Sequence, residues 1–84
     1  MRPRRLLKRI IMAPHNVRFR DLLGLAEALG CRVERIEGSH HILGHPDIPE
    51  LLNLQEVKGE VKPYQVRQLL HLIERHNLSL REDA

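Results

Sequence analysis

The sequence predicts an α+β fold in which helices cover one face of a three-stranded antiparallel sheet. Two segments with apolar residues at helical spacing come first, three short segments with strand-type patterning follow, and the longest helical pattern comes last. Short turns between the strand segments favour an antiparallel meander, and the apolar face of such a sheet needs helices against it. The 84 residues correspond to one small domain.

The two helical segments before the predicted sheet carry different charges. Residues 3–12, PRRLLKRIIM, place apolar side chains on one side and cations on the other, with Pro3 at a first helical position and Pro14 beyond the end. Residues 16–31 follow, and Gly30 stands where a helix C-terminal glycine belongs. The stripe of this second helix has the spacing of one buried face and comprises Phe19, Leu22, Leu23, Ala26 and Leu29.

Three strands and a closing helix complete the prediction. RVERIE (32–37) is followed by a turn at Gly38 and Ser39, then by HHILGH (40–45) and ELLNLQEV (50–57). The last strand has Leu52 and Leu54 on one face, with Asn53 and Gln55 on the other. After a loop at 58–60, residues 62–77 form the longest helix, which Pro63 opens and Asn77 ends, and its stripe is Val66, Leu69, Leu70 and Ile73.

Charge divides the chain into a basic arm (1–14), a main domain (15–80) and a short tail (81–84). The first 20 residues hold seven Lys or Arg and no acid, whereas the rest holds seven Lys or Arg against eleven Asp or Glu. Such an arm is typical of chains that meet a polyanion, although a solvated helix face gives the same pattern. The single Cys31 suits a reducing, cytoplasmic setting, and no stretch is long enough to span a membrane.

The histidines of GSHHILGHP do not have the spacing of a metal site. His40 and His41 point to opposite faces of a strand, and His41 and His45 are separated by roughly 13 Å. One zinc ion, with Zn–N bonds of about 2.0–2.1 Å, cannot bridge that distance. A strand histidine is most often a packing residue, but His40 and His41 cannot both face one core. The outward one is open to a substrate and is suited to proton transfer near neutral pH.

GSHHILGHP, then LLNLQ and KPYQVRQLLHLIERHNL, resemble the HicA (YcfA-like) toxins of bacterial toxin–antitoxin pairs over about residues 17–80. The resemblance implies a fold similar to a double-stranded-RNA-binding domain, preceded here by an extra short N-terminal helix. It also implies an endoribonuclease (mRNA interferase) that cleaves mRNA without a metal or other cofactor and is blocked by a HicB-type antitoxin. The family's catalytic histidine falls on His40 and its turn glycine on Gly38.

The chemistry of the neighbouring residues agrees with that activity. A neutral imidazole can remove the proton of the RNA 2′-OH, and cations or backbone N–H groups can stabilise the charged phosphorane. Gly38 and Ser39 let the chain approach a phosphate. Lys62, Tyr64 and Gln65 lie at the start of the last helix, where free N–H groups are expected, and Arg67 lies one turn in.

Each of these assignments has a simpler alternative. Lys62 and Arg67 can be a solvated helix face, Tyr64 a packing residue and Ser39 a turn residue. His41 is expected to face the helices, yet it is the second candidate for the base, since a slip of one residue exchanges the faces. His45 is interpreted as an exposed strand end rather than a weak phosphate contact.

The sequence departs from the family pattern at three positions, where Leu43, Gly44 and Cys31 replace an aromatic, a basic and a Phe residue. Leu43 can still pack, but Gly44 loses an RNA contact, and the smaller Cys31 shrinks the core. A non-catalytic RNA-binding module or a decayed toxin on the same fold is therefore the alternative function. A protein-interaction domain that binds through the N-terminal helix is a third.

Overall fold

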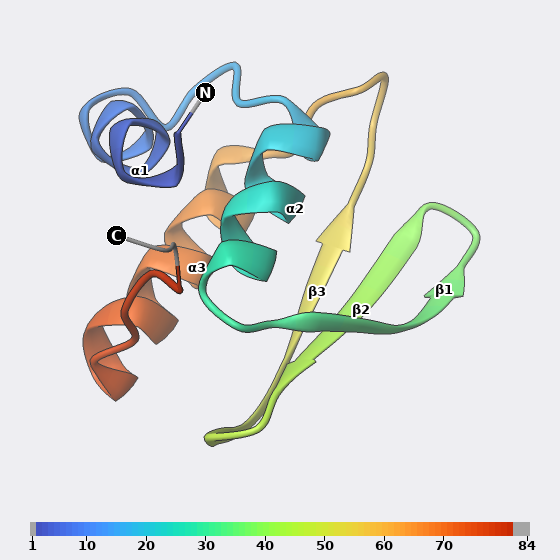
Figure 1. Cartoon of the computed structure of the whole chain (residues 1–84). Coiled ribbons are helices and arrows are strands. Elements are labelled where there is room, and N and C mark those ends of the chain that lie inside the picture. Colours follow the sequence, from blue (N-terminus) through green and yellow to red (C-terminus); the bar gives the residue numbers. More distant parts are fainter. Residues whose placement is uncertain (1, 82–84) are drawn as a thin grey trace.

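The computed structural model describes residues 2–81 and has the predicted order of elements (Figure 1). Met1 of the predicted arm and residues 82–84 of the predicted tail lie outside the described residues. The fold is α+β, as predicted. Its elements are α1 (Pro3–Met12), α2 (Phe19–Ala28), β1 (Arg32–Glu37), β2 (His40–His45), β3 (Ile48–Gln55) and α3 (Pro63–His76).

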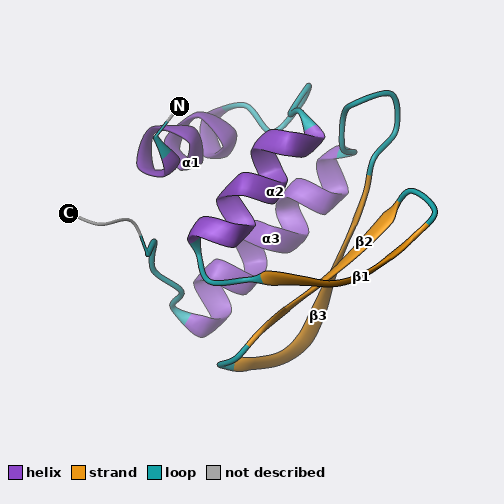
Figure 2. Cartoon of the chain, turned by 45° about the vertical axis from the view of Figure 1, so that its right-hand side comes forward, coloured by secondary structure: helices purple, strands orange, loops and turns teal. Residues whose placement is uncertain are grey.

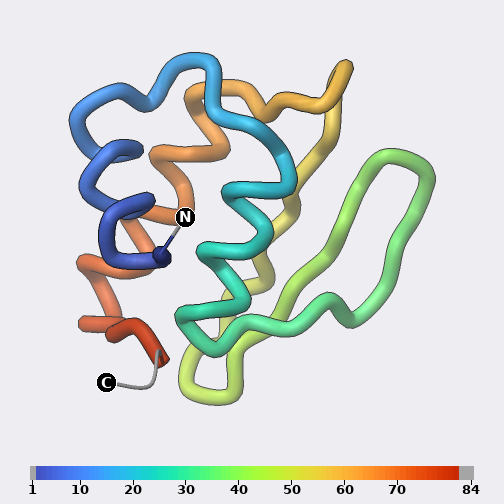
Figure 3. The backbone as a smooth tube through the Cα atoms, turned by 45° about the horizontal axis from the view of Figure 1, so that its top comes forward, coloured from blue at the N-terminus to red at the C-terminus, as the bar shows by residue number. Residues whose placement is uncertain are grey.

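The three strands form one antiparallel sheet in the order β1-β2-β3. Helices α2 and α3 lie side by side on one face of this sheet, and α1 packs on α2 at the side away from the strands (Figures 1 and 2). The β1–β2 hairpin extends beyond the helices (Figure 3). The opposite, outer face of the sheet has no helix against it in the described chain.

A β-bulge at Glu34 brings the two apolar residues of β1 to the same face of the sheet. Val33 lies opposite Leu43, and Ile36 lies opposite His41, with the register shifting between Val33 and Arg35. Residues three apart on a regular strand would face opposite sides, but the extra residue brings Val33 and Ile36 to the same face. Only Val33 is covered by the helices, since Ile36 is 60% exposed near the tip of the hairpin.

The apolar core lies between the helices and the inner face of the sheet, and α1 contributes Leu6 and Ile10 to it. The predicted stripes are correct in part. Leu25 and Leu72 are buried although neither was predicted, and three predicted members are only partly buried (Leu23, Leu70 and Ile73). Because α2 packs against both α1 and β3, its buried arc is wider than a single stripe.

Backbone conformation explains where the elements end. Gly30 (φ +102°) follows α2 and Asn77 (φ +52°) ends α3, both in the left-handed region typical of helix C-termini, as predicted. Gly38 has φ +60° whereas Ser39 has a negative φ, which is the pattern of a two-residue type II′ hairpin turn. Within residues 2–81, none of the helices is both long and apolar enough to cross a membrane.

Candidate functional site

The two adjacent histidines lie on opposite faces of the sheet, and His41 faces the helices as expected. His41 lies opposite Leu54, and its ring packs against Phe19 of α2 with ring centroids 4.6 Å apart. The His41 Nδ1 atom is buried and has no hydrogen-bond partner in the described structure. His40 lies between Glu37 and Gln55 on the outer face. A substrate can therefore reach His40 without displacing a helix.

The imidazole of His40 has one hydrogen bond, which is made on the outer face. His40 Nδ1 lies 3.0 Å from Oδ1 of Asn53 on the neighbouring strand β3. Within residues 2–81, the Nε2 atom has no partner. The ring is thus held by one nitrogen while the other faces solvent, which is the arrangement a base needs.

The hairpin turn beside His40 is open. Apart from the two chain neighbours of Gly38, no described residue has an atom within 4 Å of the position that a Cβ would take there. The Ser39 hydroxyl accepts a hydrogen bond from Nε2 of Gln55 (3.3 Å), and its carbonyl accepts one from the Glu56 N–H (3.1 Å). These bonds tie the turn to the end of β3 and leave the Gly38 backbone accessible.

The start of α3 is joined to this same end of the sheet. The Gln55 N–H donates to Oε1 of Gln65, which is buried, at 3.2 Å. The expectation of a free N–H at Gln65 is wrong, because that group donates to the Lys62 carbonyl at 2.9 Å. Pro63 has no N–H. At the start of α3, the Tyr64 N–H therefore donates to no other group of the described chain and is available to a ligand. The Tyr64 side chain is 53% exposed, so it is not buried by packing.

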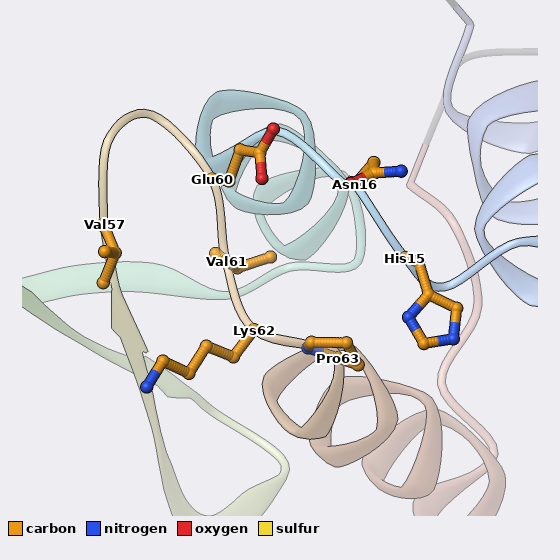
Figure 4. Close-up of a pocket in the computed structure, with 7 residues that line it drawn as sticks. All are labelled: His15, Asn16, Val57, Glu60, Val61, Lys62 and Pro63. Atoms are coloured by element: carbon orange, nitrogen blue, oxygen red, sulfur yellow. The ribbon is translucent and has the colours of Figure 1, made fainter.

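The two predicted phosphate-binding cations are exposed and unpaired. Lys62 and Arg67 have no hydrogen bond or ion pair with any residue of the described chain. Lys62 also borders a pocket of about 300 Å³ lined by His15, Asn16, Val57, Glu60, Val61, Lys62 and Pro63. In Figure 4 the Lys62 side chain extends away from His15. The charges of Lys62 and Arg67 are therefore available to an anionic ligand. Neither residue has a hydrogen bond or ion pair with His40 in the described chain.

His45 is not the exposed strand end that was expected, nor a phosphate contact. It is 7% exposed, and its Nε2 lies 3.0 Å from the Leu29 carbonyl, while Nδ1 accepts a hydrogen bond from the Asp47 N–H at 3.0 Å. Gly30 leaves room for the ring, since a Cβ at Gly30 would lie 2.9 Å from Nε2. His45 therefore links the end of β2 to the end of α2.

The three positions that depart from the family pattern have clear structural surroundings. Leu43 is fully buried in the core, so it packs as expected. Cys31 is buried, and this burial raises the pKa of its thiol, with Arg81 acting in the opposite direction. At Gly44, the Glu34 carboxylate occupies the place of a Cβ. Among residues 2–81, no group of three or more His, Cys, Asp or Glu could hold a metal ion.

Sequence reasoning did not assign a role to Asn53, Gln55 or Gln65. The alternation of β3 did place Asn53 and Gln55 on the face away from the core. Which residues of β2 lie next to Asn53 and Gln55 depends on the register of the two strands. For Gln65, the sequence pattern indicates only the backbone N–H at the helix start. A polar pair on the outer face, next to a strand that carries an outward histidine, was the available indication.

Comparisons with known proteins support the sequence resemblance. A family model for the HicA toxin of bacterial toxin–antitoxin systems matches residues 19–74. This range begins with α2 and ends within α3, so it contains the turn, the three strands and the start of α3, but not α1. Neither a curated protein nor a solved structure matches the chain.

Proposed function

Because this chain belongs to the HicA toxin family of bacterial toxin–antitoxin systems, we propose that it is an endoribonuclease that cleaves mRNA with His40 as the general base. A HicB-type antitoxin neutralises it. The observation that carries the proposal is the state of His40, which has an oriented ring and a solvent-facing Nε2 beside an open glycine turn. His41 is a poorer candidate, since it packs against Phe19.

The proposed reaction uses the nucleophile that RNA itself carries. His40 Nε2 takes the proton of a 2′-OH, and the 2′-oxygen forms a bond to the adjacent phosphorus while the P–O5′ bond breaks. The leaving 5′-oxygen takes a proton from water or from the imidazolium. The products are a 2′,3′-cyclic phosphate and a 5′-hydroxyl end. A positioned base contributes about 10²–10⁴-fold to such a step, which needs no metal ion.

Exposed cations and backbone groups support binding of the reacting phosphate. Lys62 and Arg67 have no acidic partner among residues 2–81, so their charge can stabilise the phosphorane. The Tyr64 N–H lies at the positive end of the α3 dipole. Gly38 and Ser39 let the RNA backbone come close to His40. Each of these contacts acts on the phosphate rather than on the identity of a base.

The second candidate function is a non-catalytic RNA-binding module, or a toxin that has lost its activity. It is favoured by the exposed cations of α1, among which Arg5 and Lys8 have no acidic partner in residues 2–81. Gly44 also lacks the basic side chain that is common in the family. Such a module binds through phosphates, so its affinity falls steeply with salt and depends little on any histidine.

Growth arrest on induction of this chain alone separates these functions. We compare wild type with His40→Ala and with His71→Ala, in which an exposed histidine on α3 is removed as a matched control. The soluble levels of the three proteins are matched. Arrest by wild type and His71→Ala, but not by His40→Ala, is the expected result. Arrest by all three assigns toxicity to binding or to another residue, and arrest by none favours a binding module or a decayed toxin.

Cleavage of a short RNA by the purified proteins tests the chemistry directly. With a chelator present, wild type is expected to leave 2′,3′-cyclic phosphate ends, and His40→Ala is expected to lose at least about a hundredfold in rate. Cleavage that needs an added divalent ion, or that leaves 3′-hydroxyl ends, would contradict the proposed reaction. Co-expression of a HicB-type antitoxin should relieve the growth arrest.

A further inference from the structure

We propose that Asn53 is a positioning residue that holds neutral His40 in the tautomer with the proton on Nδ1. The tautomer rests on the amide oxygen of Asn53 being the atom that faces Nδ1, while its consequence for catalysis rests on the proposed function. The Oδ1 atom of Asn53, at 3.0 Å from Nδ1, can only accept a hydrogen bond. The ring nitrogen that faces it must therefore carry the proton, and Nε2 is left with the lone pair.

This assignment reverses the intrinsic preference of a histidine side chain, which places the proton on Nε2. Without the Asn53 acceptor, Nε2 would be mostly protonated and would be a donor instead of a base. The basic lone pair would then lie on Nδ1, which points toward β3 instead of solvent. Asn53 thus selects which nitrogen meets the substrate, without touching the reacting atoms.

The strand register brings Asn53 within reach of His40. His40 lies opposite Gln55, and Asn53 lies opposite Ile42, so Asn53 is the diagonal neighbour of His40 on the outer face. Diagonal neighbours in an antiparallel pair are close enough for polar side chains to meet. Because the ladder of β2 and β3 fixes both backbones, the hydrogen bond is held by the sheet rather than by a loop.

The other groups around His40 leave Asn53 as the acceptor. Glu37 lies opposite His40 on β1, but its carboxylate pairs with Arg35 at 2.7 Å. On the β3 side, Gln55 donates through Nε2 to the Ser39 hydroxyl, and its side chain makes no hydrogen bond to the His40 ring in the described chain. Among residues 2–81, Asn53 makes the sole hydrogen bond to the His40 ring.

His45 has the opposite tautomer and provides an internal reference in the same molecule. Its Nδ1 accepts from the Asp47 N–H, so its proton is on Nε2 and is donated to the Leu29 carbonyl. Two histidines on one strand therefore have opposite tautomers, each set by the partner of one ring nitrogen. One spectrum can report both.

Long-range proton–nitrogen NMR of the ¹⁵N-histidine-labelled full chain, at about pH 8 where imidazoles are neutral, tests the tautomer without any assay of activity. The missing signals in His40→Ala and His45→Phe assign the two residues. We expect the Nδ1–H pattern for His40 and the Nε2–H pattern for His45. Asn53→Ala should convert His40 to predominantly Nε2–H, and Asn53→Asp, which keeps an acceptor, should not. An Nε2–H pattern for His40 in wild type overturns the proposal.

Single-turnover and steady-state cleavage of a short RNA then tests the positioning role. Asn53→Ala is expected to lower kcat about tenfold with KM unchanged, and Asn53→Asp to restore most of the rate. The matched control is Leu51→Ala, which changes an exposed residue of the same face and should leave both constants unchanged. Equal losses in Asn53→Ala and Leu51→Ala, or a change confined to KM, would overturn the positioning role.

These tests keep the two proposals apart. An Nδ1–H His40 in a protein that cleaves no RNA leaves the tautomer assignment correct and contradicts the endoribonuclease. An active nuclease whose His40 is in the Nε2–H form supports the endoribonuclease and overturns the tautomer assignment.

Discussion

The ring of His41 lies 4.6 Å from the ring of Phe19, tilted by 56°, and thereby fastens β2 to the first residue of α2. His40, one residue earlier, is bonded to Asn53 on the other side of the sheet. A single peptide unit thus separates a histidine that packs from a histidine that is open to solvent. Substitutions at the two positions are expected to affect different properties.

Replacing His41 tests its packing role. The buried Nδ1 has no hydrogen-bond partner among residues 2–81, so His41→Phe removes an unsatisfied polar atom while keeping the ring contact, and stability should be unchanged or higher. His41→Ala should lower the free energy of unfolding by about 1–3 kcal/mol, because it leaves a gap beside Phe19. Urea denaturation measures both. His40→Ala is the control, with a change within about 0.5 kcal/mol; a larger loss there than at His41 would reverse the two roles.

The thiol of Cys31 should be unreactive in the folded protein. Burial raises its pKa above the ordinary 9.0, so the nucleophilic thiolate is scarce near neutral pH. A disulfide reagent should label the native chain slowly and the urea-unfolded chain at once.

The raised pKa of the Cys31 thiol stabilises the fold below pH 9.0, and this contribution is lost as the pH rises further. The stability of Cys31→Ala should not fall in this way at high pH. In the labelling experiment, rapid modification of the native chain would show that the Cys31 site opens readily.

The carboxylate of Glu50 should make stability depend on acidic pH. The hydrogen bond from His76 Nε2 (3.0 Å) holds the pKa of Glu50 below the ordinary 4.5, and Arg75 (3.1 Å) acts in the same direction. A lowered pKa stabilises the fold above the unfolded value, and the contribution disappears as the pH falls through the folded value. Thermal unfolding should therefore show Glu50→Gln to be less stable than wild type at about pH 6 and equal in strong acid.

The Glu50 prediction has a matched control on α3. Glu74→Gln removes an exposed carboxylate that has no ion pair in the described chain, so its unfolding should follow wild type at each pH. A constant difference between Glu50→Gln and wild type down to strong acid would show that the pairing with His76 does not stabilise the fold.

Adding a cation at Gly44 should strengthen RNA binding. The Gly44 backbone does not have a positive φ, and a Cβ there would meet the flexible end of Glu34, which can move aside. Gly44 is buried, so Gly44→Arg should lower the free energy of unfolding by about 1 kcal/mol as the Glu34 side chain is displaced. It should also tighten binding of a short RNA several-fold, with a salt dependence steeper by about one ion. Binding is measured in the His40→Ala background, which prevents cleavage.

A neutral side chain separates the two effects of the Gly44 substitution. Gly44→Gln meets Glu34 in the same way but adds no charge, so its RNA affinity should equal that of the parent. Equal tightening by Gln and Arg would exclude a phosphate contact. A loss of more than about 2 kcal/mol in both variants would mean that Glu34 cannot move.

The order of the elements and several of their ends could be predicted because they depend on local chemistry, whereas the third strand, predicted at 50–57, lies at Ile48–Gln55. Pro3 and Pro63 open helices, Gly30 and Asn77 end them, and Gly38 makes the turn. Leu25 and Leu72 were missed for a different reason. Whether a residue beside the main stripe is buried depends on the neighbouring elements, and a one-dimensional pattern contains no information about those.

The site was predictable only in part for the same reason. The opposite faces of His40 and His41 follow from the period of a strand, so they could be read directly. The burial of His45 depends on a carbonyl at Leu29, 16 residues away, and the bond to Asn53 depends on the register of β2 and β3. Polar partners distant in sequence are fixed by tertiary structure, and the sequence pattern does not reveal them.

The layering of the molecule separates the exposed cations of α1 from the proposed site at His40. Helix α1 lies on the far side of α2 from the strands (Figures 1 and 2), so helix α2 and the sheet lie between α1 and the outer face of the sheet that carries His40. A nucleic-acid strand lying against His40 cannot simply continue along α1. Occupying both surfaces takes either one strand that wraps around an edge of the domain or two separate strands, in which case the chain becomes a bridge between them.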